Sequence, residues 1–166
     1  MENDEIKYTA FVPSPVGYLK VEGDTRSVTA VVFCEEPGTQ SAELPAHILE
    51  TIRQLEAYFN GATGDFNLPL AQPGTDFQQK VWAELVRIPF GKTISYLELS
   101  KRIGDVKAIR AAGLANGKNN IAIIVPCHRV IGSDGSLTGY AGGLWRKEWL
   151  LRHEREIIHG KQETLF

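Results

Sequence analysis

The chain has 166 residues, 43% of them hydrophobic, and a formal net charge of −2 at pH 7, so it can bury the core of one domain or of two small ones. Its apolar runs are too short to span a membrane, and the acidic start Met1–Glu5 is unlike a basic signal peptide. We therefore expect a cytoplasmic protein without membrane contact. The only two cysteines, Cys34 and Cys127, form no C-x-x-C pair, which argues against a disulfide framework or a zinc knuckle.

Charge is unevenly divided along the chain. Residues 1–75 hold 4 Lys and Arg against 11 Asp and Glu, whereas residues 76–154 hold 12 against 7. A basic half suggests a polyanionic partner, although ordinary solvated faces would give the same balance. Charge alone does not decide between these interpretations.

The acidic half begins with three strand-like runs, Ile6–Val12, Val16–Glu22 and Ser27–Cys34, which predict an antiparallel meander. A helix should follow, ending at Asn60-Gly61. Four of its apolar residues share one face: Ile48, Ile52, Leu55 and Phe59. This half is expected to support the rest of the chain.

Few residues in the acidic half are candidates for chemistry, and only Cys34 and His47 are kept as candidates for a further site. Leu70–Gly74 has the composition of a connector. We accordingly predict a supporting domain over residues 1–72, a second domain over 75–157 and a tail over 158–166.

The second domain should open with a helix, because Thr75 and Gln78 have the spacing of a capping box. Pro89 and Gly91 should end this helix. Its apolar stripe consists of Phe77, Val81, Leu85 and Ile88.

A pair of short helices is predicted next. Ser95 and Glu98 form another capping pattern, Gly104 should close that helix, and Asp105 can cap the one that follows. Two helices around a tight turn make a helix-turn-helix, which commonly presents its second helix to DNA. Helix pairs also occur in ordinary cores.

The second helix of this pair has a face of small residues, which lets another surface approach closely. The face consists of Ala108, Ala111, Ala112 and Ala115, with Gly113 alongside. It could pack against a neighbouring helix or enter a DNA groove. Arg110 points away from this face and is either a solvated surface charge or a wedge that enters a base stack.

An apolar run, Ile121–Val125, predicts a short buried strand that stops at Pro126. Cys127 follows, with His128 and Arg129 next in sequence. A thiol is nucleophilic only as the thiolate, and a neighbouring base or positive charge can produce that form. Cys127 could alternatively be a small buried hydrophobe, but its polar neighbours favour a nucleophile.

Two loops and a helix complete the chain. The runs Gly132–Ser136 and Thr138–Gly143 are rich in turn residues and small residues, and such loops often form the wall of a pocket. A last helix is expected from Leu144 through Glu154, with Glu154 on a partly apolar side. A carboxylate there needs a partner such as His128, unless it reaches solvent at a frayed helix end.

The run Val125–Val130 resembles the active-site motif of the O6-alkylguanine-DNA alkyltransferases, also called methylated-DNA–protein-cysteine methyltransferases. The resemblance is close over residues 75–156 and extends to the acidic half only in general layout. Further matching segments are Ser95-Tyr96, Arg110–Gly113, Ala115–Gly117, Tyr140–Gly143 and Lys147–Glu154. The family implies an α/β (α+β) fold: a ribonuclease H-like sheet and helix, then a mainly helical domain with a winged helix-turn-helix-like motif.

The resemblance also implies roles for individual residues. Cys127 would be the nucleophile that accepts the alkyl group, His128 its base through a water molecule, and Glu154 the group that orients His128. Tyr96 would protonate the departing guanine and help to rotate its phosphate. Arg110 would fill the space left by the flipped nucleotide.

The remaining matched positions are assigned in the same way. Arg129 is expected to be structural, fixing the loop by a salt bridge. DNA-binding positions besides Arg110 are Ala111, Gly113 and Asn116; hinge and pocket positions are Asn119, Tyr140 and Lys147. The family often has proline after the hinge asparagine, where this chain has Asn120, and this difference could loosen the turn without abolishing activity.

The implied reaction is a single, irreversible transfer to Cys127 from O6-alkylguanine, and in some cases O4-alkylthymine, in double-stranded DNA that a monomer approaches from the minor groove. No cofactor is expected, because the damaged DNA is itself the alkyl donor. The zinc ligands of some relatives are not evident, so no metal is expected.

Three other classes remain open at this stage. A damage-binding relative would lack the reactive cysteine, which this chain has. A cysteine hydrolase using Cys127 and His128 would act on esters or peptides without DNA. A sequence-specific regulator would discriminate among undamaged DNA sequences.

Overall fold

The computed structural model describes residues 6–164 and divides into two compact units, one up to Pro73 and one from Gly74. The mixed α/β fold predicted from the family is confirmed. Met1–Glu5, whose acidity argued against a signal peptide, lies outside the described residues. The predicted division into a supporting domain, a second domain and a tail remains a prediction.

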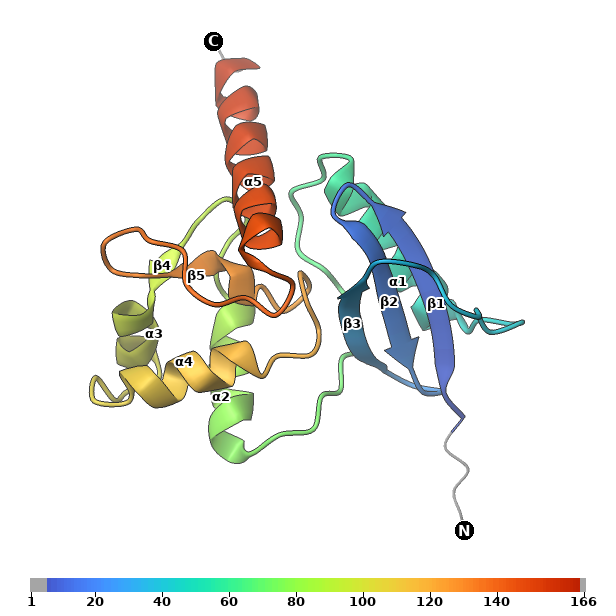
Figure 1. The fold of residues 1–166 in the computed structure, drawn as a ribbon, viewed down its shortest axis with the longest axis horizontal. Helices are drawn as coiled ribbons and strands as arrows, with labels where there is room; N and C mark the ends of the chain where they lie inside the picture. Colours follow the sequence, from blue (N-terminus) through green and yellow to red (C-terminus); the bar gives the residue numbers. More distant parts are fainter. Residues whose placement is uncertain (1–5, 165–166) are drawn as a thin grey trace. The chain divides into compact units, whose positions relative to one another are not determined.

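The amino-terminal unit is a three-stranded antiparallel sheet in the order β1-β2-β3 (Figure 1). Its strands are β1 (Tyr8–Ser14), β2 (Gly17–Gly23) and β3 (Val28–Cys34), each close to its predicted range. The strands β1 and β2 join through a two-residue turn, and the hydroxyl of Ser14 at that turn accepts a hydrogen bond from the Val16 N–H. The predicted meander is confirmed.

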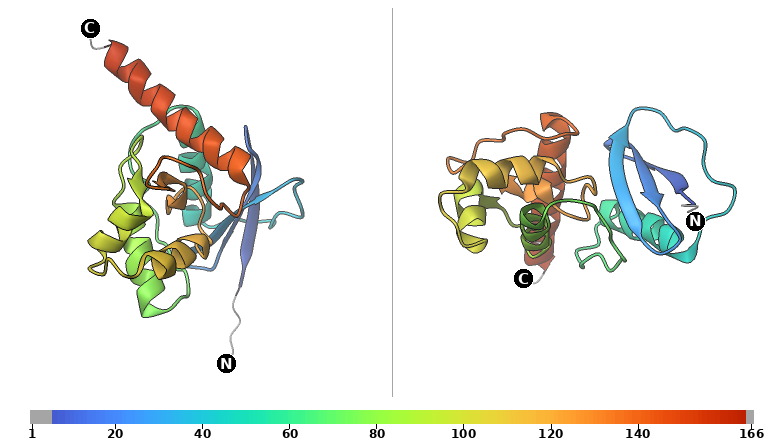
Figure 2. Two further views of the ribbon diagram at one scale, coloured as in Figure 1. Left: turned by 60° about the vertical axis from the view of Figure 1, so that its left-hand side comes forward. Right: turned by 90° about the horizontal axis from the view of Figure 1, so that it is seen from below.

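One helix, α1 (Ala46–Phe59), packs against this sheet and lies across one of its faces (Figure 2). It ends at Asn60 and Gly61, as predicted, and the positive φ of 104° at Gly61 suits a glycine there. The fully inward positions are Ile48, Thr51, Leu55 and Tyr58, so the buried face is rotated slightly from the predicted one. Ile52 and Phe59 lie at its border.

The carboxy-terminal unit begins with α2 (Asp76–Val86), and both hydrogen bonds of the predicted Thr75–Gln78 capping box are present. The next helix is α3 (Tyr96–Arg102), whose N-cap Ser95 accepts a hydrogen bond from the Glu98 N–H. Gly104 follows α3 with a φ of 91°, which explains the glycine there. The last three elements of the helical layer are α4 (Ile109–Gly117), the 3-10 turn η1 (Cys127–Arg129) and α5 (Leu144–Thr164).

The predicted cap at Asp105 is wrong. Helix α4 begins after Ala108 and has no side-chain cap. The Asp105 carboxylate instead accepts a hydrogen bond from the Lys107 N–H at 2.9 Å. The backbone carbonyl of Asp105 accepts one from the Ala108 N–H. An aspartate that closes its own turn is not available to a helix that starts later.

The small face of α4 has two environments. Ala112 and Ala115 are buried in the contact of α4 with α2, where the Trp82 indole donates to the Ala115 carbonyl at 2.9 Å. Ala111 and Arg110 are exposed. Packing against a helix therefore explains part of the small face and leaves the exposed part for another surface.

The predicted strand Ile121–Val125 is wrong, although all five residues are buried. The segment is a compact turn in which the Val125 N–H donates to the Ile121 carbonyl at 3.0 Å, and Ile123 has a φ of 71°. The Asn119 side chain takes the place of a neighbouring strand. Its Oδ1 accepts from the Ile121 N–H at 3.1 Å, and its Nδ2 donates to the Val125 carbonyl at 2.8 Å.

Two very short strands pair within the carboxy-terminal unit. Strand β4 (Ile94–Ser95) pairs in parallel with β5 (Val130–Ile131), which directly follows η1. Since β4 leads into Tyr96 and β5 leaves from Arg129, the pairing brings the start of α3 close to the Cys127 turn. This pairing has no counterpart in the sequence predictions.

The last helix is longer than predicted. Helix α5 continues to Thr164, so the predicted tail over 158–166 begins inside the helix, and its last two residues lie outside the described part. Ile158 packs against Gly91, where a Cβ would lie 2.5 Å from Ile158 Cγ1. This contact helps to explain why the helix continues past Glu154.

Candidate active site

Cys127 is the first residue of η1 and is 7% exposed. Its Sγ lies 3.3 Å from Nδ2 of Asn119, the residue that also holds the preceding turn. Burial raises the pKa of the Cys127 thiol, and the Asn119 contact and the nearby charge of Lys147 oppose this effect without cancelling it. The thiol is therefore protonated at rest, and a base is needed to make it nucleophilic.

His128 and Glu154 form a fully buried pair. His128 Nε2 and Glu154 Oε2 are 2.7 Å apart, and the two side chains are 0% and 1% exposed. Burial lowers the pKa of His128 even though Glu154 favours its charged form. The imidazole is thus neutral, carries its proton on Nε2 toward the carboxylate, and leaves Nδ1 as an acceptor.

The other nitrogen of the imidazole, Nδ1, has no hydrogen-bond partner among the residues that the structure describes. Within the described part of the chain, His128 Nδ1 is buried and makes no hydrogen bond to protein. A buried acceptor in this state needs a functional explanation, because leaving it unpaired costs about 1–3 kcal/mol. An unpaired basic nitrogen on the residue next to Cys127 is suited to receive the thiol proton.

Glu154 is held from several directions. Arg129 Nε donates to its Oε1 at 2.9 Å, and the Gly91 N–H donates to the same oxygen at 3.0 Å. Burial alone would raise the pKa of Glu154, but the hydrogen bond from His128 and the charge of Arg129 hold it well below its usual 4.5. The alternative in which Glu154 reaches solvent at a frayed helix end is wrong.

Arg129 forms a buried ion pair with Glu154. Besides its bonds to Glu154, its NH1 donates to the Ile88 carbonyl at 2.7 Å, and its guanidinium lies 5.8 Å from the centre of the Phe90 ring. The arginine thus connects η1, α5 and the loop that follows α2. This arrangement keeps the carboxylate ionised and its orientation fixed.

A pocket of about 410 Å³ lies between α3, α4 and the loop before α5. Tyr96 and Arg110 are at its wall, together with Gly113, Leu114, Asn116, Gly117 and residues 138–141. Asn116 links the pocket to the nucleophile, since its Nδ2 donates to the Cys127 carbonyl at 3.4 Å. Its Oδ1 is buried without a hydrogen-bond partner in the described residues.

Tyr140 and Lys147, two further predicted site residues, have shifted pKa values. Burial raises the pKa of Tyr140 well above 10.0, so its phenol stays protonated. Lys147 is a fully buried side chain whose Nζ donates to the Thr138 carbonyl at 2.9 Å, and burial lowers its pKa from 10.5. Its ammonium lies 5.9 Å from the centre of the Tyr96 ring.

The structure therefore brings most of the predicted site residues together. Hydrogen bonds join Cys127 to Asn116 and Asn119, and Glu154 to His128 and Arg129. Tyr96, Arg110, Gly113, Asn116 and Tyr140 line the pocket. Ala111 is exposed on α4 and is not among the residues that line the pocket.

Sequence reasoning missed three contributors: the Gly91 N–H, the Ile88 carbonyl and Thr138. The first two are backbone groups in Ile88–Gly91, a segment interpreted only as the end of a helix, and backbone groups leave no mark in a sequence. Thr138 was included in a small, turn-rich loop. Its hydroxyl lies 3.1 Å from the Tyr96 hydroxyl.

Exposed basic side chains lie on the helix pair that forms part of the pocket wall. Lys101, Lys107, Arg110 and Lys118 are exposed on α3, α4 and their flanking turns. Exposed apolar side chains lie among them, with Ile109 at 41% and Leu114 at 64% exposure. Cations mixed with apolar side chains on a helix pair suit a nucleic-acid surface.

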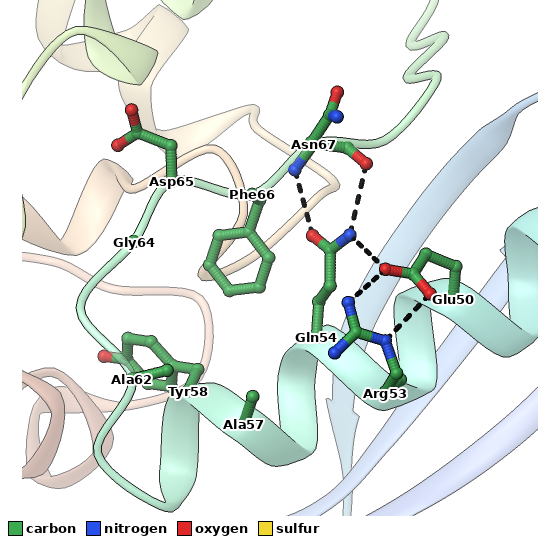
Figure 3. A pocket seen from close by; sticks show the side chains of 10 residues that line it. All are labelled: Glu50, Arg53, Gln54, Ala57, Tyr58, Ala62, Gly64, Asp65, Phe66 and Asn67. Atoms are coloured by element: carbon green, nitrogen blue, oxygen red, sulfur yellow. Dashed lines mark hydrogen bonds and ion pairs between the residues drawn. The ribbon is translucent and has the colours of Figure 1, made fainter.

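The amino-terminal unit has a second pocket, of about 350 Å³, between α1 and residues 62–67 (Figure 3). Three of its polar side chains, Glu50, Arg53 and Gln54, pair with one another or with backbone. Glu50 accepts from Arg53 and Gln54, and the Gln54 amide pairs with the backbone of Asn67 in both directions. These groups are already paired; Arg53 and Asn67 are exposed, and Glu50 and Gln54 are half-buried, which is typical of a surface network.

The two candidates kept from the acidic half are not in a comparable cluster. His47 Nε2 is bound to the Asp24 carbonyl at 2.8 Å, and Cys34 is a half-buried residue at the end of β3. Among the described residues, no group of three or more His, Cys, Asp and Glu side chains could hold a metal ion. The described part also has no helix that is long and apolar enough to cross a membrane.

Comparisons with known proteins give one consistent result. Residues 76–156 match the model of the 6-O-methylguanine DNA methyltransferase DNA-binding domain, and residues 7–72 match that of its ribonuclease-like domain. A methylated-DNA–protein-cysteine methyltransferase from Methanosarcina barkeri is 47% identical over 91% of this chain and 99% of the relative.

Solved structures agree. The crystal structure of Mycobacterium tuberculosis O6-methylguanine methyltransferase matches with a TM-score of 0.82 and 43% identity, over 91% of this chain and 94% of that one. A structure of the M. tuberculosis OGT in complex with DNA matches with a TM-score of 0.80 and 46% identity, over 89% and 92%.

Proposed function

Because the chain belongs to the methylated-DNA–protein-cysteine methyltransferase family, we propose that it repairs DNA by moving a methyl or other alkyl group from O6 of guanine to its own Cys127. The observation that carries this assignment to particular residues is the buried contact between His128 Nε2 and Glu154, directly beside Cys127. The same chemistry applies to O4-alkylthymine.

The first step is activation of the thiol. His128 Nδ1 takes the Cys127 proton through a bridging water molecule, because adjacent residues in a 3-10 turn do not face each other directly. Glu154, kept ionised by Arg129, stabilises the imidazolium that forms. In the resting site the Cys127 thiol and the His128 imidazole are both neutral, so the thiolate forms only when a reactive alkyl carbon is present to consume it.

The second step is an in-line displacement. The thiolate sulfur bonds to the alkyl carbon, the carbon–O6 bond breaks, and its electron pair passes to the guanine, which takes a proton from Tyr96. The position of Tyr96 in the pocket wall supports this role. The product is a thioether, which has no route back to a thiol here, so each molecule reacts once.

DNA is approached through α3 and α4. We propose that a monomer docks the exposed part of α4 into the minor groove of duplex DNA, with Arg110 filling the space of the flipped nucleotide. Exposure of Arg110 at the pocket rim supports this role. Asn119 supports the turn before Cys127, and Ala111 and Gly113 let the backbone approach the DNA.

Mass spectrometry after incubation with a duplex that contains one O6-methylguanine tests the function. We expect stoichiometric addition of one methylene to the peptide that contains Cys127. Cys127→Ala should abolish the gain, and Cys34→Ala is the matched control that should keep it. Tight binding to the lesion without transfer would contradict the proposal and indicate a damage-recognition protein.

A further inference from the structure

Thr138 makes two hydrogen bonds that connect three elements of the site. Its hydroxyl donates to the Tyr96 hydroxyl oxygen at 3.1 Å, and its carbonyl accepts from Lys147 Nζ at 2.9 Å. Tyr96 begins α3, Lys147 is on α5, and Thr138 is in the loop between β5 and α5. The threonine is therefore positioned to fix this loop and the phenol relative to each other.

The ring of Tyr96 is already restrained on its sides. A Cβ at Gly113 would lie 3.7 Å from Tyr96 Cδ1, which places the ring against α4. The Lys147 ammonium lies 5.9 Å from the ring centre. Tyr96 and Thr138 both line the pocket, and the Thr138 hydroxyl contacts the Tyr96 hydroxyl.

The direction of the hydrogen bond matters for proton donation. When Thr138 donates to the phenolic oxygen, the Tyr96 O–H is directed to another acceptor, such as a base in the pocket. The same bond becomes stronger once the proton leaves, because the acceptor is then a phenolate. Such a bond stabilises the charge that develops during transfer more than it stabilises the resting site.

We propose that Thr138 is a positioning residue for proton donation by Tyr96, an inference that rests on the proposed function. The sulfur–carbon bond forms as the carbon–O6 bond breaks, the electron pair goes to guanine, and the Tyr96 proton follows it. The phenolate accepts the Thr138 hydrogen bond until it is reprotonated through solvent by the proton that His128 took from Cys127. All protons are then accounted for.

The exposure of Thr138 makes this proposal distinguishable from a structural role. In the free protein Thr138 is exposed, so water competes for its hydrogen bonds and their loss should change stability little. Thr138 and Tyr96 both line the pocket, so a base bound there covers them. The contact should then matter for the rate of transfer and not for folding.

The test is single-turnover transfer from a duplex with one O6-methylguanine, at saturating protein. We expect Thr138→Val and Thr138→Ala to slow transfer about tenfold, the size of one hydrogen bond to a charged group. Thr138→Ser should restore the rate because it keeps the hydroxyl. Duplex affinity and thermal unfolding should match those of the unsubstituted protein.

A double-mutant cycle with Tyr96→Phe decides whether Thr138 acts through Tyr96. In the Tyr96→Phe background, Thr138→Val should slow transfer no further. An equal slowing in both backgrounds, or normal rates for Thr138→Val and Thr138→Ala, would overturn the inference. Absence of transfer by the unsubstituted protein would instead contradict the proposed function, so the two failures are distinguishable.

Discussion

The two units of this protein differ in how many polar side chains they bury. Among the described residues, Thr51 is the one buried polar side chain of the amino-terminal unit, and it donates to the His47 carbonyl one helical turn earlier. The carboxy-terminal unit buries several charged or amide side chains, among them His128, Lys147 and Glu154.

Burial of such groups costs free energy unless each one is paired. Apart from Thr51, the described polar side chains of the amino-terminal unit are not fully buried, and Glu50, Arg53 and Gln54 at its pocket hydrogen-bond to one another. In the carboxy-terminal unit some buried atoms, among them His128 Nδ1 and Asn116 Oδ1, have no hydrogen-bond partner in the described residues. Incomplete pairing, more than the presence of a pocket, therefore distinguishes the reactive unit.

Of the tests of this contrast, Glu154→Gln has the largest expected effect. The change leaves Arg129 buried without its anion, so we expect the free energy of unfolding of this unit to fall by about 3–5 kcal/mol. Transfer should slow about a hundredfold, because the imidazolium loses its counter-charge. All three tryptophans, Trp82, Trp145 and Trp149, are in this unit, so denaturant unfolding followed by tryptophan fluorescence measures its stability.

Glu156→Gln is the matched control, since Glu156 is exposed on the same helix. It should leave both the fluorescence transition and the transfer rate unchanged. If Glu154→Gln behaved like this control, the buried contacts of Glu154 with His128 and Arg129 would not be what stabilises the site.

A second test concerns the turn before Cys127. Asn119→Ala removes the partners of the Ile121 N–H and the Val125 carbonyl, and each buried group left unpaired should cost about 1–3 kcal/mol. The same fluorescence transition measures the loss. The exposed Asn120 gives the control Asn120→Ala, and equal stability of the two variants would show that the asparagine does not hold the turn.

Acid should destabilise the carboxy-terminal unit first. The pKa of His128 is lowered from 6.5 and that of Glu154 from 4.5, so for both groups the unfolded chain binds more protons than the folded one below these values. Stability should therefore fall as pH decreases from 6.5, and more steeply below 4.5. Unfolding midpoints by tryptophan fluorescence between pH 7 and pH 4 measure this, and a flat profile would contradict the assigned charge states.

The smallest effect is expected in the other unit. Arg53→Ala breaks an exposed ion pair beside the amino-terminal pocket, and such pairs contribute little. Thermal unfolding and alkyl transfer should both match those of the unsubstituted protein. A clear loss of transfer would show that the amino-terminal pocket takes part in the reaction, which would break the contrast between the units.

Local signals in the sequence were sufficient where side chains close to one another decide the structure. The Thr75–Gln78 box, the strands of the meander and the end of α1 at Asn60-Gly61 all depend on neighbours within a few residues. The pairing of Glu154 with His128 was also predictable, because a carboxylate on an apolar helix side needs a buried partner.

The segment Ile121–Val125 shows where such signals fail. Five apolar residues in sequence suit a buried strand and a buried turn equally well, since both remove the side chains from water. The Asn119 side chain decided between them by bonding to the backbone groups that a neighbouring strand would have paired.

The sequence by itself determined the division into an acidic and a basic half, most secondary structure elements and the cysteine-histidine motif, because composition, periodicity and capping act over short distances. Only the tertiary structure decided that the Gly91 N–H and the Ile88 carbonyl fix Glu154 and Arg129, and that Thr138 contacts Tyr96. These contacts join residues dozens of positions apart, two of them through backbone groups that every residue type can supply, so they depend on how α2, α3 and α5 pack and not on any local pattern.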